Sequence, residues 1–132
     1  MGQAAAKKGD RITATDTHIV MVPSPGGPVP TPLPHPFAGQ LNGGLSSDVN
    51  IMGMAAATVG STADNSPAHV AMPPGTSFQA PPANKGTVKM GSSTVKINGK
   101  AAARNGDAAE TCNDPSDAPV GTVVAAGTVK FG

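Results

Sequence analysis

Short runs of alternating apolar and polar residues are the clearest structural signal in this chain. Residues 87–90 (TVKM) and 94–97 (TVKI) flank a short Gly-containing turn, which predicts a β-hairpin. Its inward-facing residues would be Val88, Met90, Val95 and Ile97, with Lys89 and Lys96 facing outward. Residues 18–22, 48–51 and 127–131 are further strand candidates. The alanine triplets favour helix, but Gly follows each within three residues. The sequence therefore predicts an all-β protein with little or no helix.

An alanine-rich motif occurs three times, at residues 4–10 (AAAKKGD), 55–61 (AAATVGS) and 101–107 (AAARNGD). The repeat extends beyond this motif, because residues 46–57 align without gaps on residues 92–103 and keep Ser, Val, Ile, Gly and Ala in phase. A low-complexity tract would not preserve that phase, so the pattern indicates a repeated β architecture. We expect three hairpin repeats around a pseudo-threefold axis, with the alanine triplets as tight packing points.

Two segments interrupt the repeats. Residues 23–36 (PSPGGPVPTPLPHP) hold seven of the 14 prolines, which predicts a stiff, extended segment of the polyproline type. Its simplest interpretation is a rigid surface loop or a proline-rich ligand for another domain. Residues 65–84 contain two Pro-Pro pairs. We expect them to form an ordered loop that crosses the outside of the sheet.

Composition limits both the core and the class of partner. The 132 residues include no Trp, no Tyr and three Phe, so a single domain would be only marginally stable without an additional staple. Nine Lys and Arg against eight Asp and Glu, without a basic run, argue against nucleic-acid binding. The single cysteine excludes an internal disulfide. We see no signal peptide and no long apolar run, so we expect a cytoplasmic chain unless dedicated machinery exports it.

The chain contains three histidines and one cysteine, which is the number of ligands in a closed tetrahedral zinc site. His18 and His69 each lie nine residues after a motif glycine, and Cys112 lies six residues after the third. A pseudo-threefold axis would bring these side chains to one point, and His35 would reach it from the proline-rich segment. Each residue alone is more simply a hydrogen-bonded histidine or a small buried cysteine. The zinc prediction therefore rests on the equivalence of the repeats.

Catalytic alternatives are weaker. Four protein ligands leave no position on zinc for water, so this site would be structural and not hydrolytic. Glu110, the only glutamate, has no second carboxylate at a matched position. Cys112 beside a histidine could imitate a thiol nucleophile, but such a residue usually occupies a cleft on a larger scaffold. Asp10 and Asp107 are more simply turn caps. We therefore expect no enzymatic activity.

The repeat motif resembles that of the PAAR-repeat family. The resemblance rests on residues 101–107, on the looser copy at residues 4–10, and on a proline-rich stretch at residues 28–34 that is similar to that of the PAAR-like branch. The motif's Pro is Ala in all three copies, and its Arg is Lys7 in the first and Thr58 in the second. Members of the family form a small β cone with a zinc ion near its point. The resemblance implies one structural Zn²⁺ held by His18, His35, His69 and Cys112.

The resemblance also implies a function. Residues 1–132 would form a single spike-tip domain without an effector extension. This domain would cap and sharpen the trimeric, VgrG-like spike of a contractile injection machine, such as a type VI secretion system, and pierce the target envelope with only transient membrane contact. As a monomer it would dock through apolar strand faces that carry Val88, Met90, Val129 and Phe131, with effector or cargo proteins as further candidate partners. It would be cytoplasmic before firing and then injected or secreted. The alternative is a free-standing zinc-binding adaptor that links cargo or a toxin to a spike protein.

Overall fold

The computed structural model describes residues 2–132, which consist of strands and loops without a helix. The strands in these residues are β1 (Gln3–Ala4), β2 (Arg11–Val22), β3 (Val29–Gly43), β4 (Asn50–Ile51), β5 (Met54–Ala55), β6 (Thr62–Asn65), β7 (Ser77–Phe78), β8 (Lys85–Val88), β9 (Lys96–Ile97), β10 (Lys100–Ala101), β11 (Ala108–Thr111), β12 (Ala118–Val124) and β13 (Lys130–Phe131). The all-β prediction is confirmed. In the described part of the chain, no helix has the length and apolar character needed to cross a membrane.

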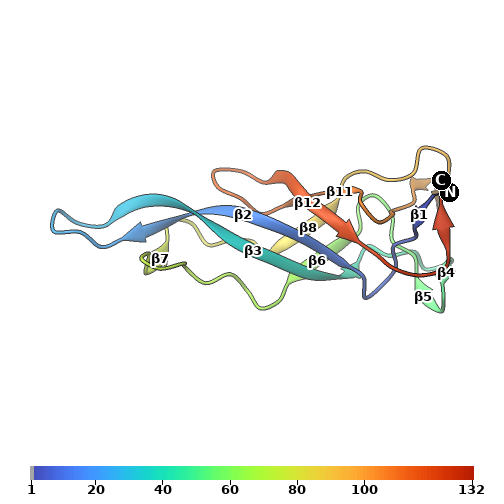
Figure 1. Cartoon of the computed structure of the whole chain (residues 1–132), viewed down its shortest axis with the longest axis horizontal. Helices are drawn as coiled ribbons and strands as arrows, with labels where there is room; N and C mark the ends of the chain where they lie inside the picture. The colour runs from blue at the N-terminus through green and yellow to red at the C-terminus, as the bar shows by residue number, and fades with distance from the viewer. Residues whose placement is uncertain (1) are drawn as a thin grey trace.

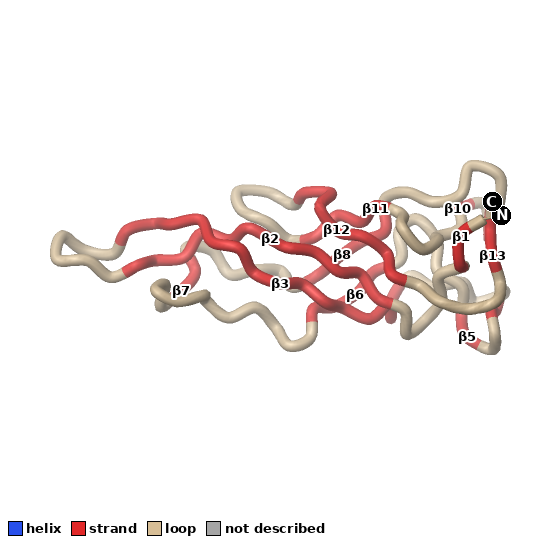
Figure 2. The backbone as a smooth tube through the Cα atoms, in the orientation of Figure 1, coloured by secondary structure: helices blue, strands red, loops and turns tan. Residues whose placement is uncertain are grey.

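A seven-stranded sheet forms the body of the molecule, in the order β12-β11-β8-β6-β3-β2-β7. An additional pairing of β12 with β2 closes the first six of these strands on themselves. The molecule is elongated, with both termini at one end and the β2–β3 hairpin reaching furthest toward the other (Figure 1). Figure 2 shows that the short strands β1, β5, β10 and β13 gather at the end that holds the termini. We call this end the base and the opposite end the apex.

The spacing of the prolines suits the open edge of β3. The backbone N–H of Ile19 donates to the Asp114 carboxylate, on the side of β2 that faces away from β3. Its partner in the ladder, Pro32, must therefore also direct its backbone groups away from β2. Proline at such a position costs no ladder hydrogen bond and prevents a further strand from pairing. The same register holds for Pro30, Pro34 and Pro36. The prediction of a polyproline-type segment is thus wrong from Val29 onward, because these residues form a regular β-strand.

The three alanine-rich motifs end in the same turn. In each copy the backbone N–H of the fourth residue donates to the side chain of the seventh, at 2.7–3.0 Å: Lys7 to Asp10, Thr58 to Ser61 and Arg104 to Asp107. The glycine before the seventh residue has a φ of 91–96° in all three copies, which favours glycine over other residues. The predicted turn-capping role of Asp10 and Asp107 is confirmed.

Backbone hydrogen bonds link the three motifs into a closed ring. Ala6 N–H donates to the carbonyl of Ala103, Ala103 N–H to that of Ala57, and Ala57 N–H to that of Ala6, each at 3.0 Å. All three alanines are fully buried. A residue larger than alanine would not fit where three chain segments approach this closely. The alanine triplets are therefore packing points around a pseudo-threefold axis, as the repeat pattern predicts.

Three two-stranded ladders surround this ring at the base: β4–β5, β9–β10 and β1–β13. The first two are tight hairpins whose turns, Met52-Gly53 and Asn98-Gly99, have positive φ at both residues. The third ladder pairs the two ends of the chain and completes the threefold arrangement. The ladders enclose a small core of Ala5, Ile51, Ala56, Ile97 and Ala102, with Val49, Val95 and Phe131 packed against it.

The predicted hairpin between residues 87–90 and 94–97 is wrong. β8 pairs with β6 and β11 in the main sheet, whereas β9 pairs with β10 across the Asn98-Gly99 turn. Asn-Gly is a stronger hairpin signal than Gly91–Ser93, because both of its residues accept positive φ. Met90 consequently faces solvent, with 61% of its surface exposed, and Val88 lies fully buried in the core of the main sheet. Val88 therefore cannot contribute to a docking face.

Candidate metal centre

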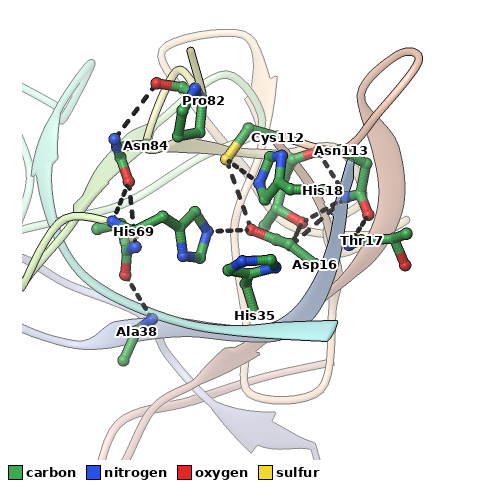
Figure 3. Close-up of polar contacts among 12 residues, drawn as sticks. Asp16, Thr17, His18, His35, Ala38, His69, Pro82, Asn84, Cys112 and Asn113 are labelled. Carbon is green, nitrogen blue, oxygen red and sulfur yellow. Dashed lines mark hydrogen bonds and ion pairs between the residues drawn. The ribbon is translucent and has the colours of Figure 1, made fainter. Parts of the chain in front are cut away.

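Five side chains from four separate segments gather inside the apical half of the molecule, and Figure 3 shows them together. Asp16 and His18 lie two residues apart in β2, so they point to the same face of the strand. His35 comes from β3, and Cys112 directly follows β11. His69 lies in the loop between β6 and β7. The structure thus brings together all four of the side chains predicted from the sequence and adds one, Asp16.

Four of the five side chains present their donor atoms to a common point. One donor atom each from Asp16, His18, His69 and Cys112 lie within 4.8 Å of one another. Cys112 Sγ is 3.6 Å from His18 Nε2 and 3.5 Å from Asp16 Oδ2. Asp16 Oδ2 is also 2.9 Å from His69 Nε2. Nitrogen, sulfur and carboxylate oxygen at this spacing are the ligands from which tetrahedral zinc sites are built.

His35 lies beside this group. The centre of its ring is 5.4 Å from that of His18 and 5.6 Å from that of His69. Its Nδ1 is 2.9 Å from the carbonyl oxygen of Leu33, and its Nε2 accepts the backbone N–H of Met72 at 3.2 Å. Backbone groups therefore engage both ring nitrogens. The proximity of His35 to the other histidines agrees with the sequence, and its role as a metal ligand stays a prediction.

Burial sets the charge state of His18. Only 1% of its side chain is exposed, and removal from water lowers the pKa of the imidazole, an effect that the neighbouring His69 increases. The Asp114 carboxylate, 3.5 Å from His18 Nδ1, acts in the opposite direction but does not reverse the shift. His18 Nδ1 forms no hydrogen bond with residues 2–132. The neutral ring leaves the Nε2 lone pair free to face Cys112 and a metal ion.

Cys112 is a buried thiol in an unfavourable place for a free thiolate. Burial raises its pKa, and the nearby negative charge of Asp16 raises it further. The backbone amides of Asn84 and Lys85 oppose this shift only in part. A metal ion would reverse the balance, because a cation stabilises the thiolate and displaces its proton. The cysteine is therefore suited to metal binding, and its raised pKa disfavours nucleophilic chemistry in the absence of a metal.

A network of amide side chains positions His69. The backbone N–H of His69 donates to the Asn84 side chain at 2.7 Å, and the Asn65 amide group donates to the same oxygen at 3.2 Å. Asn65 in turn accepts the backbone N–H of Ala38 at 3.0 Å. Figure 3 shows these contacts as a chain from β3 to the loop that carries His69. Because the loop has little regular structure of its own, these side chains fix the position of the ring.

The positions of the candidate ligands only partly follow the equivalence of the repeats from which they were predicted. His18 lies within a strand, whereas His69 lies beyond the end of β6, in a loop that turns back toward the axis. Asp16 was not among the ligands predicted from the sequence. Its separation of two residues from His18 in an alternating strand was the only available signal, and aspartate is common enough for that signal to be weak.

The fold and the site together define a small all-β protein with a threefold repeat at its base and a candidate metal centre in its apical half. A family model described as the PAAR motif matches residues 19–115. The match covers most of the chain, and the chain belongs to this family. The PAAR motif family is a structural family associated with the spike tips of contractile injection systems, and it is not known as an enzyme family. No curated protein and no solved structure matches the chain significantly.

Proposed function

We propose that this protein caps the trimeric, VgrG-like spike of a contractile injection machine of the type VI secretion kind and forms its piercing tip. The observation that carries the proposal is the closed ring of hydrogen bonds among Ala6, Ala57 and Ala103, with three equivalent ladders around it. A monomer with a pseudo-threefold base can present a similar surface to each chain of a trimer. Without that symmetry, one copy could match only one of the three chains.

The base also has the chemistry of an interface. Met52 and Met54 belong to the β4–β5 hairpin and Val129 directly precedes β13; they are 55%, 39% and 36% exposed, although they are apolar. Exposed apolar groups that gather at one end of a molecule favour burial against a partner. Methionine side chains are flexible and adapt to an uneven surface. We place the docking surface here and not on Val88, which is buried.

At the apical end, the proposed role of the candidate centre is structural. His18, His69 and Cys112 would hold one Zn²⁺, with a fourth protein ligand completing the shell. Such a site has no position for water and supplies rigidity instead of hydrolysis. The core of the apical region contains few large side chains, so metal binding energy would replace hydrophobic burial there. In keeping with this role, the protein would be cytoplasmic before firing and would leave the cell with the spike.

A binding experiment tests the capping proposal. The purified chain is mixed with the trimeric spike protein of its machine, and the mass of the complex is measured by light scattering. We expect one copy of the chain per trimer. The variant Met54→Asp should bind at least about tenfold more weakly, because it would bury a carboxylate without a partner. Val70→Asp is the matched control, since Val70 is 74% exposed but adjoins His69 in the apical half.

Equal loss of binding in both variants, or an unchanged affinity for Met54→Asp, would place the interface elsewhere. Phe131→Asp is a less clean test, because Phe131 packs against the base core and its loss would also disturb the β1–β13 ladder.

Metal analysis tests the structural role of the centre separately. Freshly purified protein should contain one equivalent of zinc, and Cys112→Ser should contain much less. Protein that is folded but holds well below one equivalent of any transition metal would overturn the metal proposal and leave the capping proposal intact.

A further inference from the structure

We propose that the base recognises an acidic spike end that presents one carboxylate per chain, and that Asn50, Lys96 and Lys130 meet these three carboxylates. The proposal rests on the capping function and specifies the chemistry of the partner. Two independent observations support it: three equivalent hydrogen-bond donors in the ladders of the base, and an excess of exposed positive charge at this end of the molecule.

Asn50, Lys96 and Lys130 occupy the same position in the three ladders, whose strands gather at the base (Figure 2). Each is the ladder partner of the first alanine of a motif; these alanines are Ala55, Ala101 and Ala4. The residue after each packs in or against the base core; these residues are Ile51, Ile97 and Phe131. Because successive side chains of a strand point to opposite faces, the three donors project from the ladder faces that point away from this core.

All three of these side chains are exposed, and all three donate hydrogen bonds. Asparagine donates through its amide group, and lysine through an ammonium group that cannot accept. Neither lysine has an ion-pair partner within residues 2–132, where the ion pairs of lysine and arginine are Lys7–Asp10, Lys89–Glu110 and Arg104–Asp107. Each repeat can therefore offer a donor to an acceptor that a trimer presents three times.

The other exposed position of the ladders has no such common character. It lies directly across from the residue that packs in the core, and it holds Gln3, Met54 and Lys100. One of these side chains is neutral and polar, one is apolar and one is a cation. The donor character is thus shared by the three repeats at the position of Asn50, Lys96 and Lys130 and not at this one.

Exposed charge is unevenly divided between the base and the rest of the molecule. In the repeats of the base (residues 2–10, 46–61, 92–107 and 126–132), the exposed charged side chains are four lysines and one aspartate: Lys8, Lys96, Lys100, Lys130 and Asp48. Elsewhere in residues 2–132 the exposed charges are balanced, since Lys89 pairs with Glu110 and the others are Arg11, Lys85, Asp64 and Asp117. The base therefore has an excess of three positive charges, which favours a partner of opposite charge.

The donors lie beside the apolar groups of the proposed docking surface. Asn50 belongs to the hairpin that carries Met52 and Met54, and Lys130 adjoins Val129. Stable interfaces combine an apolar centre with a polar rim, and charged groups at the rim chiefly speed association and select the partner. The apolar groups would therefore supply most of the affinity, while the donors would select a spike whose end is acidic.

The threefold pattern favours a protein trimer over other polyanions. An anionic membrane or a nucleic acid attracts lysines according to their number and has no matching threefold arrangement of acceptors. Such a partner would gain nothing from the equivalence of the neutral Asn50 with the two lysines. A trimer gains a hydrogen bond at each of the three positions.

Association kinetics test the acidic partner. The trimeric spike protein of the machine is immobilised, and the rate at which the chain binds is measured at about 50 mM and about 500 mM NaCl. The association rate should fall about tenfold or more at the higher salt concentration, because salt screens the attraction between exposed charges. A rate that does not depend on salt would overturn this inference and leave the capping function intact. If no complex formed at either concentration, both would fall.

Asn50→Lys is the sharpest variant, because the proposal predicts a gain. It completes a ring of three lysines and should speed association about two- to fivefold at low salt. Gln79→Lys is the matched control: it adds the same charge directly after β7, at an exposed position in the apical half, and should have no effect. Equal rates in the two variants would show that total charge alone matters and would contradict the threefold match.

The reverse pair removes a charge. Lys96→Gln should slow association by a similar factor, whereas Lys85→Gln, at an exposed position in the main sheet, should not. Vesicles with about one-third anionic lipid and a short duplex DNA are offered to the same proteins as alternative polyanions. We expect neither to bind as tightly as the spike does. Binding of either at the strength of the spike, with an equal loss in Lys96→Gln, would overturn the assignment to a protein partner.

Discussion

The base and the apical region of this protein are stabilised in opposite ways. The base is held by repeated backbone hydrogen bonds among segments of small residues, and each of its three parts has nearly the same geometry. The apical region is held by single side chains that occur once, among them Asp16, His18, His69, Asn84 and Cys112. Symmetry is therefore confined to the end that would face a trimer.

The difference reflects how much apolar material each region contains. The alanine ring needs only close approach of the backbone, which small residues permit. The apical region narrows to a hairpin whose outer positions are prolines, and residues 2–132 offer it only two phenylalanines, Phe37 and Phe78, as large aromatic side chains. Polar side chains, and the metal ion they are suited to hold, therefore replace a hydrophobic core there.

Removal of metal should separate the two regions most clearly. A strong chelator should destabilise the protein by several kcal/mol and lower Tm by at least about 10 °C, because structural zinc contributes binding energy directly to folding. The chain has no Trp or Tyr, so calorimetry is the suitable measurement. By hydrogen exchange, the amides of residues 66–72 should lose protection, while those of Ala6, Ala57 and Ala103 should keep it. Equal loss in both regions would show that the base is not independent of the metal.

Overpacking the alanine ring should destabilise the base and the core of the main sheet, to which Ala6, Ala57 and Ala103 also belong. Ala57→Leu places a large side chain at a fully buried position and should cost about 1–3 kcal/mol or more. Ala80→Leu, at an exposed position, is the matched control and should be neutral. Urea denaturation measures the loss, and zinc content should not change. If Ala57→Leu were as stable as the control, the ring would be less tightly packed than the hydrogen bonds indicate.

The turn at Asn98 should make a smaller contribution to the base. Its φ of 53° is costly for most residues, and its side chain bonds Ser46 at 2.6 Å and Asp48 at 2.8 Å. Asn98→Ala should therefore cost about 1–2 kcal/mol. Asn98→Gly removes the same hydrogen bonds but relieves the backbone, so it separates the two causes. If both variants were equally destabilised, the side-chain bonds to the neighbouring repeat would account for the whole effect.

The pH dependence of the metal-free chain should be the smallest effect, and it should arise in the apical region. Burial lowers the pKa of His18, so folding favours its neutral form. Its contribution to stability is present above the unfolded value of 6.5 and is lost as the pH falls through the lower folded value. One such group changes stability by at most about 1.4 kcal/mol per pH unit. Calorimetry between about pH 7.5 and 5 should show a decline that is shallower in His18→Gln; the same slope in both proteins would assign the decline to other groups.

The repeat explains why much of the base could be predicted from sequence. The spacing of the alanine motifs, the glycine in each, and the alignment of residues 46–57 with 92–103 are enough to indicate three equivalent units. The wrong hairpin prediction at residues 87–97 arose within the same pattern, because two strands of similar sequence were predicted to pair with each other. In the structure β8 pairs with β6 and β11, and β9 pairs with β10. Alternation identifies a strand but does not identify its neighbour.

The sequence by itself determined the all-β class, the threefold base, the positions of the capped turns, and the short list of residues able to bind a metal. Only the tertiary structure decided how β3 uses its prolines, which strands close the sheet, and how His69 reaches His18 from a loop. It also placed Asp16 among the donors and engaged His35 with the backbone. The physical reason is that local periodicity is encoded within a few neighbouring residues, whereas the approach of Asp16 to Cys112, 96 positions apart, depends on the packing of every strand between them.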